Sequence, residues 1–95
     1  MILLDEIDTQ AALADYLLKR RKVNRYSRAK LAEISTVPAP TIKKFETTGQ
    51  ISLRQFLLLW QSLDDLQKLY KLTQRNPRQG ITQPRTIEEV LNAPL

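Results

Sequence analysis

Apolar residues in this chain recur every three or four positions, in short segments that capping residues or prolines separate. This is the spacing of an amphipathic helix, whereas a half-buried strand would alternate apolar and polar residues. Alternation of β-branched residues is almost absent, and only two glycines interrupt the chain, at Gly49 and Gly80. Residues that favour helix therefore dominate, and the pattern predicts an all-α fold.

The breaks between these segments predict five helices. They are expected over about residues 10–22, 27–35, 38–47, 52–62 and 64–72. Thr9, Ser27 and Ser52 carry side-chain oxygens suited to cap helix N-termini, and Ser52 opens a capping-box pattern. Pro38 is compatible with the start of the third helix, because amides of a first turn have no intrahelical acceptor. Gly49 is expected to end that helix.

The apolar positions of these segments form the expected core, with the fourth segment at its centre. They are Ala12, Leu13, Tyr16, Leu17, Leu31, Ala32, Ile34, Ile42, Phe45, Leu53, Phe56, Leu57, Leu59, Trp60, Leu66, Leu69, Tyr70 and Leu72. Phe56 and Trp60 lie on the most apolar segment, so we interpret both as core residues and not as a stacking platform for bases. Residues 1–72 are expected to form one domain.

Residues 73–95 are expected to form a C-terminal arm with a short helix. Residues 73–85 collect Thr, Gln, Arg, Asn, Pro and Gly, which is the composition of a linker. Thr86 to Glu89 match a second capping box, and Val90 and Leu91 follow on one short helix that ends before Pro94. Because two helical turns are unstable alone, this segment must dock on the domain, on a second copy or on another protein, or else fray.

Positive charge is concentrated in the middle of the chain. The formal net charge is +5, with a pI near 9.8. Residues 16–46 hold nine of the bases and two acids, and seven of these bases fall between Lys19 and Lys30 without an intervening acid. Such a block attracts a polyanion, although cations near a helix C-terminus are also favoured simply by the helix dipole. Arg20, Arg21 and Lys22 are assigned to the general positive field.

The composition removes most catalytic and metal-binding chemistry. The chain contains no cysteine and no histidine, so disulfides, thiolate or imidazole nucleophiles and common zinc sites are excluded. The adjacent acids Asp64-Asp65 and Glu88-Glu89 point to different sides of a helix. Asp5, Glu6 and Asp8 lack the ligand number and the glycine turn of a calcium loop. We therefore expect neither an enzyme nor a cofactor or metal site.

No apolar run approaches the roughly 20 residues of a membrane span. The first residues, Met1 to Glu6, carry acid where a secretory signal carries base. A cytoplasmic protein with no membrane partner is expected.

Residues 27–46, followed by Gly49, resemble the helix-turn-helix of Xre/Cro phage-repressor-type regulators. The pairs Leu31-Ala32, Thr41-Ile42 and Phe45-Glu46, together with Val37, stand at the core and recognition positions of that family. The resemblance covers about residues 10–72. It implies a compact five-helix lambda-repressor-like domain whose segment 38–47 enters the major groove of DNA.

Three positions depart from the family pattern. Arg28 stands where the family often has Gln, Thr36 takes the place of the usual turn glycine, and Pro38 replaces a frequent capping Ser or Thr. The distance from Glu46 to Gly49 is also one residue longer than usual. These departures concern the geometry of the turn and the DNA bases that the helix would prefer.

The resemblance implies a sequence-specific transcriptional regulator, most simply a repressor that binds a palindromic operator in double-stranded DNA as a homodimer. It further suggests an autoregulating antitoxin of a toxin-antitoxin operon, with a cognate toxin as partner. The DNA-binding residues carried over are Arg28, Pro38, Ala39, Pro40, Thr41, Lys43, Lys44 and Arg54.

These residues have chemically distinct expected roles. Lys44 can donate to guanine, and Thr41 can bond a base or a phosphate. Ala39 and Pro40 can pack against thymine methyl groups. Arg28 and Arg54, each at the start of a helix, are expected to reach phosphates.

Two questions stay open at this level. A protein-interaction adaptor whose helix-turn-helix has lost specific DNA readout is the alternative function, because Pro38 and Pro40 occupy the candidate recognition segment. The dimer surface has three candidates, which are the apolar start (Ile2, Leu3, Leu4, Ile7), the pair Leu69 and Tyr70, and the C-terminal group (Ile87, Val90, Leu91).

Overall fold

The computed structural model describes residues 4–74, and over that range the only regular elements are helices, which confirms the all-α prediction. They are α1 (Glu6–Val23), α2 (Arg28–Ser35), α3 (Ala39–Thr48), α4 (Leu53–Leu63), α5 (Gln67–Tyr70) and the short 3-10 helix η1 (Lys71–Thr73). The helix expected after residue 85, and most of the arm before it, lie outside the described residues. Within 4–74 no helix has the length and apolar character needed to cross a membrane.

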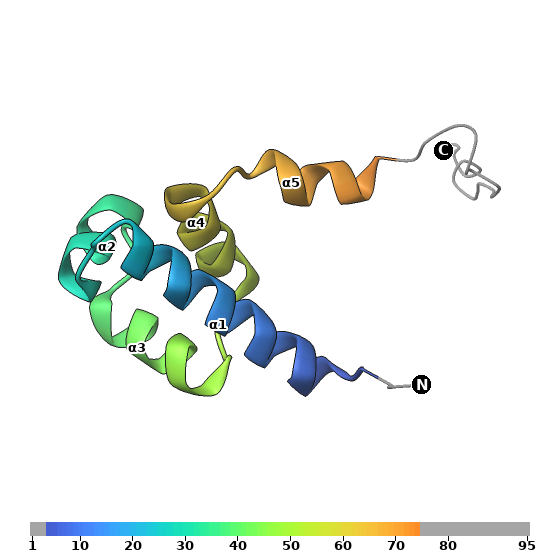
Figure 1. Ribbon diagram of the computed structural model, residues 1–95, viewed down its shortest axis with the longest axis horizontal. Coiled ribbons are helices and arrows are strands. Elements are labelled where there is room, and N and C mark those ends of the chain that lie inside the picture. The colour runs from blue at the N-terminus through green and yellow to red at the C-terminus, as the bar shows by residue number, and fades with distance from the viewer. Residues whose placement is uncertain (1–3, 75–95) are drawn as a thin grey trace, which may run out of the picture.

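Helix α1 is the longest element, and the other core helices assemble around it. It packs against α3 and α4, while α2 packs against the same two helices. Figure 1 shows these four helices as one body, from which α5 extends at the end of α4. The arrangement leaves one side of α3 and the outer side of α4 facing outward.

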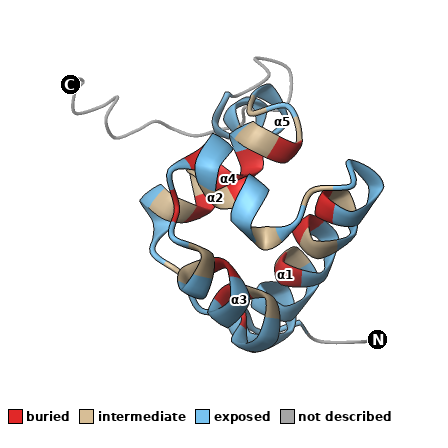
Figure 2. Ribbon diagram, turned by 90° about the vertical axis from the view of Figure 1, so that its left-hand side faces the viewer, coloured by how far each residue is buried: buried red, intermediate tan, exposed pale blue. Residues whose placement is uncertain are grey.

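The core lies where the inner faces of α1 to α4 meet, as the buried positions in Figure 2 show. Its buried apolar residues are Ala14, Leu17, Leu31, Val37, Ile42, Phe45, Phe56, Leu59, Trp60 and Leu63. Phe45 meets Phe56 edge to face with ring centroids 5.9 Å apart, and Phe56 lies 5.8 Å from Trp60. Phe56 and Trp60 are therefore core residues, as predicted, and neither is available for stacking on a base.

Three of the predicted helix boundaries are confirmed by their caps. The Ser27 hydroxyl accepts the Lys30 amide at 3.0 Å, and the Ser52 hydroxyl accepts the Gln55 amide at 3.2 Å. Gly49 ends α3 in the left-handed region with φ 78°. A Cβ at Gly49 would also lie 3.1 Å from the Gln10 Cβ of α1, so glycine allows the end of α3 to approach α1 closely.

The first helix begins earlier than predicted. Its N-cap is Asp5, whose carboxylate accepts the Asp8 amide at 2.8 Å, and its first helical residue is Glu6. Thr9, the predicted cap, instead donates its hydroxyl to the Asp5 carbonyl at 2.9 Å. The earlier start is favoured because Glu6 and Asp8 then lie in the first turn, where the helix dipole stabilises acids.

The fifth segment is the second correction. Asp64, predicted to begin it, is the C-cap of α4, and the helical region after it divides into α5 and η1. Tyr70 and Leu72 are exposed there. Other predicted core residues that lie at the surface are Ala12, Tyr16, Ile34 and Leu53. Periodicity locates the apolar face of a helix, but it does not show how far the facing helices extend to cover it.

Candidate functional site

A tight turn joins α2 to α3 and fixes their relative direction. It spans residues 36–38 and begins with Thr36 in the left-handed region, at φ 66°. The Thr36 amide bonds the Ala32 carbonyl at 2.9 Å, and the buried Ser35 hydroxyl accepts the Val37 amide at 3.1 Å. A β-branched residue in this conformation costs about 1–2 kcal/mol. The turn therefore forms without the glycine that would suit it best.

One face of α3 is anchored in the core and the opposite face is exposed. Ile42 and Phe45 are buried on the inner side. The outer stripe consists of Pro40, Lys43, Lys44 and Thr47, all exposed and spaced at three, four and seven residues. Helical spacing therefore presents one cationic, hydroxyl-bearing surface.

The predicted site residues around the stripe differ in their exposure. Ala39 and Thr41 are half-buried beside it, and Pro38 is exposed just before the helix. Thr47 was not among the predicted site residues. Its position seven residues after Pro40 was the available signal, since that spacing returns to the same face of a helix.

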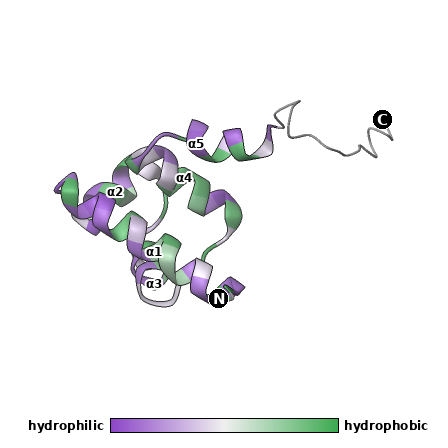
Figure 3. Ribbon diagram, turned by 45° about the vertical axis from the view of Figure 1, so that its right-hand side comes forward, coloured by the Kyte–Doolittle hydropathy of each residue, from purple (hydrophilic) through white to green (hydrophobic). Residues whose placement is uncertain are grey.

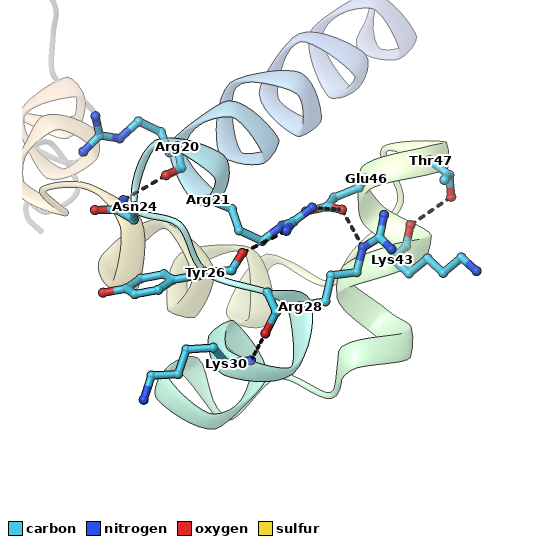
Figure 4. Close-up of polar contacts among 10 residues, drawn as sticks. Arg20, Arg21, Asn24, Tyr26, Arg28, Lys30, Lys43, Glu46 and Thr47 are labelled. Carbon is cyan, nitrogen blue, oxygen red and sulfur yellow. Dashed lines mark hydrogen bonds and ion pairs between the residues drawn. The ribbon is translucent and has the colours of Figure 1, made fainter.

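The buried carboxylate of Glu46 holds α3 to α1 and α2, as Figure 4 shows. Arg21 donates from Nε to Oε2 at 2.7 Å and from Nη2 to Oε1 at 3.1 Å. Arg28 donates from Nε to Oε1 at 2.8 Å. Arg21 also donates from Nη1 to the Tyr26 carbonyl at 2.9 Å. We call Arg21, Arg28 and Glu46 the Glu46 clamp.

The Glu46 clamp corrects the assignment of one cation and modifies that of another. Arg21 was assigned to the general positive field, but it is buried and paired with Glu46. Arg28 was expected to reach a phosphate; its Nε is engaged by Glu46, while its side chain remains 39% exposed. Lys43 precedes Glu46 by about one helical turn, so the Glu46 clamp lies one turn along α3 from a residue of the outer stripe.

Arg20 also has a specific structural role. Its Nε donates to the Leu63 carbonyl at 3.0 Å and so satisfies an acceptor at the end of α4. Lys22 is exposed, as expected for a residue of the positive field. Adjacent cations in α1 thus serve three different purposes, which their shared charge alone did not distinguish.

A hollow of about 470 Å³, lined by both polar and apolar groups, lies between α3 and the start of α4. Pro40, Thr41 and Lys44 line it from α3, and Ser52 and Gln55 line it from the start of α4. The Ser52 hydroxyl lies 3.2 Å from the Gln55 side-chain oxygen and can donate to it, which leaves the amide nitrogen of Gln55 as a donor. Gln50 adds a second amide to the lining.

The charge of the outer stripe is not neutralised within the described chain. Over residues 4–74 neither Lys43 nor Lys44 is in a salt bridge. The N-termini of α2 and α4, where helix dipoles are positive, both lie near α3, since Arg28 bonds Glu46 and Ser52 lines the hollow with Lys44. Arg54 is exposed but lines a different hollow, on the outer side of α4, so the structure does not bring it into the hollow beside Lys44.

Comparisons with protein-family models, with curated proteins and with solved structures find no match to this chain. The binding capacity of the outer stripe is therefore inferred from its geometry and charge.

Proposed function

We propose that the chain is a sequence-specific DNA-binding transcriptional regulator in which α2 and α3 act as a helix-turn-helix of the lambda-repressor kind. The outer stripe of α3 is the observation that carries this proposal. It presents two lysines that have no acidic partner among residues 4–74, on a helix whose inner side is fixed by Ile42, Phe45 and the Glu46 clamp. A rigid cationic helix of this kind is suited to the major groove, which has the width of one helix.

The surroundings of α3 suit the phosphates on either side of that groove. The N-termini of α2 and α4 favour anions through their helix dipoles, and cations beside them release counterions from DNA when they bind. Lys44 is placed to donate to guanine O6 and N7, and Thr41 to a base or phosphate. Pro40 has no donor and offers an apolar contact for a thymine methyl group.

Specific recognition further requires more than one α3. We propose a homodimer that binds a palindromic operator, with half-sites about 34–36 Å apart or a multiple of that spacing. Leu4 and Ile7 are 76% and 66% exposed at the start of α1 and form a candidate dimer surface. A repressor of this size, with chain beyond the DNA-binding helices, is also suited to autoregulation as an antitoxin that holds a cognate toxin.

Removal of the Lys44 charge tests the proposal. A labelled duplex from upstream of the chain's own gene should bind the wild type tightly, with an affinity that falls steeply with salt. Lys44→Ala should weaken that binding by about 1–3 kcal/mol and reduce the preference over a random duplex of equal length. Fluorescence anisotropy over a salt series measures both quantities.

Lys71→Ala is the matched control, because it removes the same charge from the exposed η1 helix. Its affinity for the specific duplex should stay close to that of the wild type. Equal affinity of wild type and Lys44→Ala for specific and random duplexes would exclude sequence-specific binding through α3.

A protein-interaction adaptor is the second candidate function. It is favoured by the first turn of α3, where Ala39 and Pro40 offer no side-chain donors, and by the engagement of Arg28 with Glu46. An adaptor would co-purify with a partner from its host and would retain no DNA. The anisotropy titration distinguishes the two candidates directly.

A further inference from the structure

An apolar groove runs along the outer side of α4 and onto α5. It consists of two hollows of about 310 and 570 Å³ that share Leu57 and Leu66 in their linings. Leu53 lines one end and is 72% exposed, and Tyr70 lines the other end and is 64% exposed. In Figure 3 hydrophobic colours appear on both α4 and α5, with hydrophilic colours between the two helices. We call this surface the α4–α5 groove.

The α4–α5 groove is too small to support a stable dimer by itself. Ten residues line its two hollows, whereas a stable protein interface uses roughly 20–30 residues on each side. A short amphipathic helix has a much smaller contact face, with apolar anchors at three- and four-residue spacing. The size of the groove therefore suits a short helix better than a second globular copy.

The C-terminal sequence contains a segment with the required pattern. Ile87, Val90 and Leu91 are spaced to share one helical face, and Glu88 and Glu89 fall between them. The charged residue in the groove lining is a cation, Arg54, and Lys71 lies exposed in η1 beyond its α5 end. Acids in the segment thus complement the cations at the groove.

The connection to this segment is long enough to reach any part of the groove. Thr73 lines the groove itself, and thirteen residue steps separate Gln74 from Ile87. At roughly 3.3–3.6 Å per residue the tether spans up to about 45 Å. Helix α4 with 11 residues is only about 16 Å long, at 1.5 Å per residue. A tethered segment has an effective concentration in the millimolar range, which favours docking within one chain over docking between chains at micromolar concentration.

We propose that residues 86–91 of the same chain occupy the α4–α5 groove as a short helix, with Ile87, Val90 and Leu91 against its leucines. This docking would stabilise a helix that is too short to persist alone. Two of the three candidate dimer surfaces, the Leu69–Tyr70 pair and the C-terminal group, would then contact each other within one chain. The apolar start of α1 would remain as the candidate dimer surface. The proposal does not depend on DNA binding.

Disulfide trapping tests the position of the segment, since the chain has no native cysteine. Asn92→Cys is combined in the full chain with Leu53→Cys in one variant and with Tyr70→Cys in another. Both groove positions are exposed, so these substitutions leave the core unchanged. Oxidised glutathione accepts the electrons when the two thiols join, and non-reducing gels with mass spectrometry separate intramolecular disulfides from covalent dimers.

A third variant, with Thr47→Cys and Asn92→Cys, is the control, because Thr47 is exposed on α3 outside the groove. At least one groove pair should close within the monomer about tenfold faster than the control pair. When Leu91→Asp is added to the groove variants, their rate of disulfide closure should fall to that of the control pair. Equal rates for the groove and control pairs would overturn the proposal, and so would covalent dimers as the main product.

Discussion

Glu46 connects the local chemistry of α3 to the rest of the molecule. Its side chain is 4% exposed, and Arg21, at 11%, gives it two hydrogen bonds. Burying these charges costs solvation energy, so the pair is a weak source of net stability. The Glu46 clamp instead positions α3, because it joins α1, the Tyr26 carbonyl and the start of α2 to one point on α3.

Glu46→Gln should therefore be strongly destabilising. A neutral amide leaves the Arg21 guanidinium buried without its counter-charge, and the expected loss in the free energy of unfolding is about 3 kcal/mol. Glu33→Gln is the control, since Glu33 is exposed and lies 3.6 Å from Lys30, and its cost should be under about 0.5 kcal/mol. Urea unfolding followed by circular dichroism measures both. Similar small losses in the two variants would show that the Glu46 clamp does not organise the domain.

At the residue scale, the sequence predicts interactions between residues that are close to each other along the chain. Ser27 and Ser52 cap the helices expected from their local patterns. Arg20 and Arg21 could not be separated in advance, because their partners, Leu63 and Glu46, lie 43 and 25 residues further along the chain. The exposed lysines of the candidate site, in contrast, follow from helical periodicity once Ile42 and Phe45 are assigned to the core.

At the scale of elements, a polar joint connects α1 to the start of the α5 region. The Tyr16 hydroxyl donates a hydrogen bond to the Asp64 carboxylate, and Lys68 forms a salt bridge with Asp64 at 3.0 Å. Tyr16 also stacks on Trp60 with ring centroids 5.3 Å apart. The hydrogen bond from Tyr16, assisted by the Asp65 amide and by Lys68, holds the pKa of Asp64 well below its usual range.

This lowered pKa predicts a pH-dependent contribution to stability. A carboxylate with a lowered folded-state pKa stabilises the fold fully above its unfolded pKa of about 3.9, and it loses that contribution as pH falls toward the folded value. The stability difference between wild type and Asp64→Asn should thus be constant from about pH 7 to 5 and shrink below about pH 4. Urea midpoints across this pH range provide the measurement.

Asp15→Asn serves as the control for the joint, because Asp15 lies on α1 in an exposed pair with Lys19. Its effect should be small at every pH, as surface pairs contribute little. An Asp64→Asn difference that persists unchanged at pH 3 would contradict the role given to the Tyr16 bond.

The predicted elements differ in accuracy for a physical reason. Helices α2, α3 and α4 have strong caps at one or both ends, and their boundaries match the sequence patterns closely. Both Asp5 and Thr9 can cap a helix, so the start of α1 depended on the balance between them. The α5 region has fewer core contacts, its N-cap residue Leu66 makes no side-chain capping bond, and its subdivision could not be anticipated from periodicity.

At the scale of the whole molecule, the four packed helices hold α3 with one side inward and one side outward. The core and the Glu46 clamp hold the inner side of α3, and the start of α4 lines a hollow together with Pro40 and Lys44 of the outer stripe. In our proposal this outer stripe is the DNA-reading surface, while the α4–α5 groove on another side is occupied by the chain's own C-terminal segment. Separate surfaces would then serve DNA recognition and the docking of the chain's own C-terminal segment.

Nuclear magnetic resonance tests the central claim most directly, by mapping backbone amide shifts while a duplex from upstream of the chain's own gene is added. The account predicts that the largest changes fall in α3, from Ala39 to Thr48, and at the starts of α2 and α4. Changes concentrated in α5 and η1, or no changes at salt concentrations where DNA-binding domains bind, would contradict it.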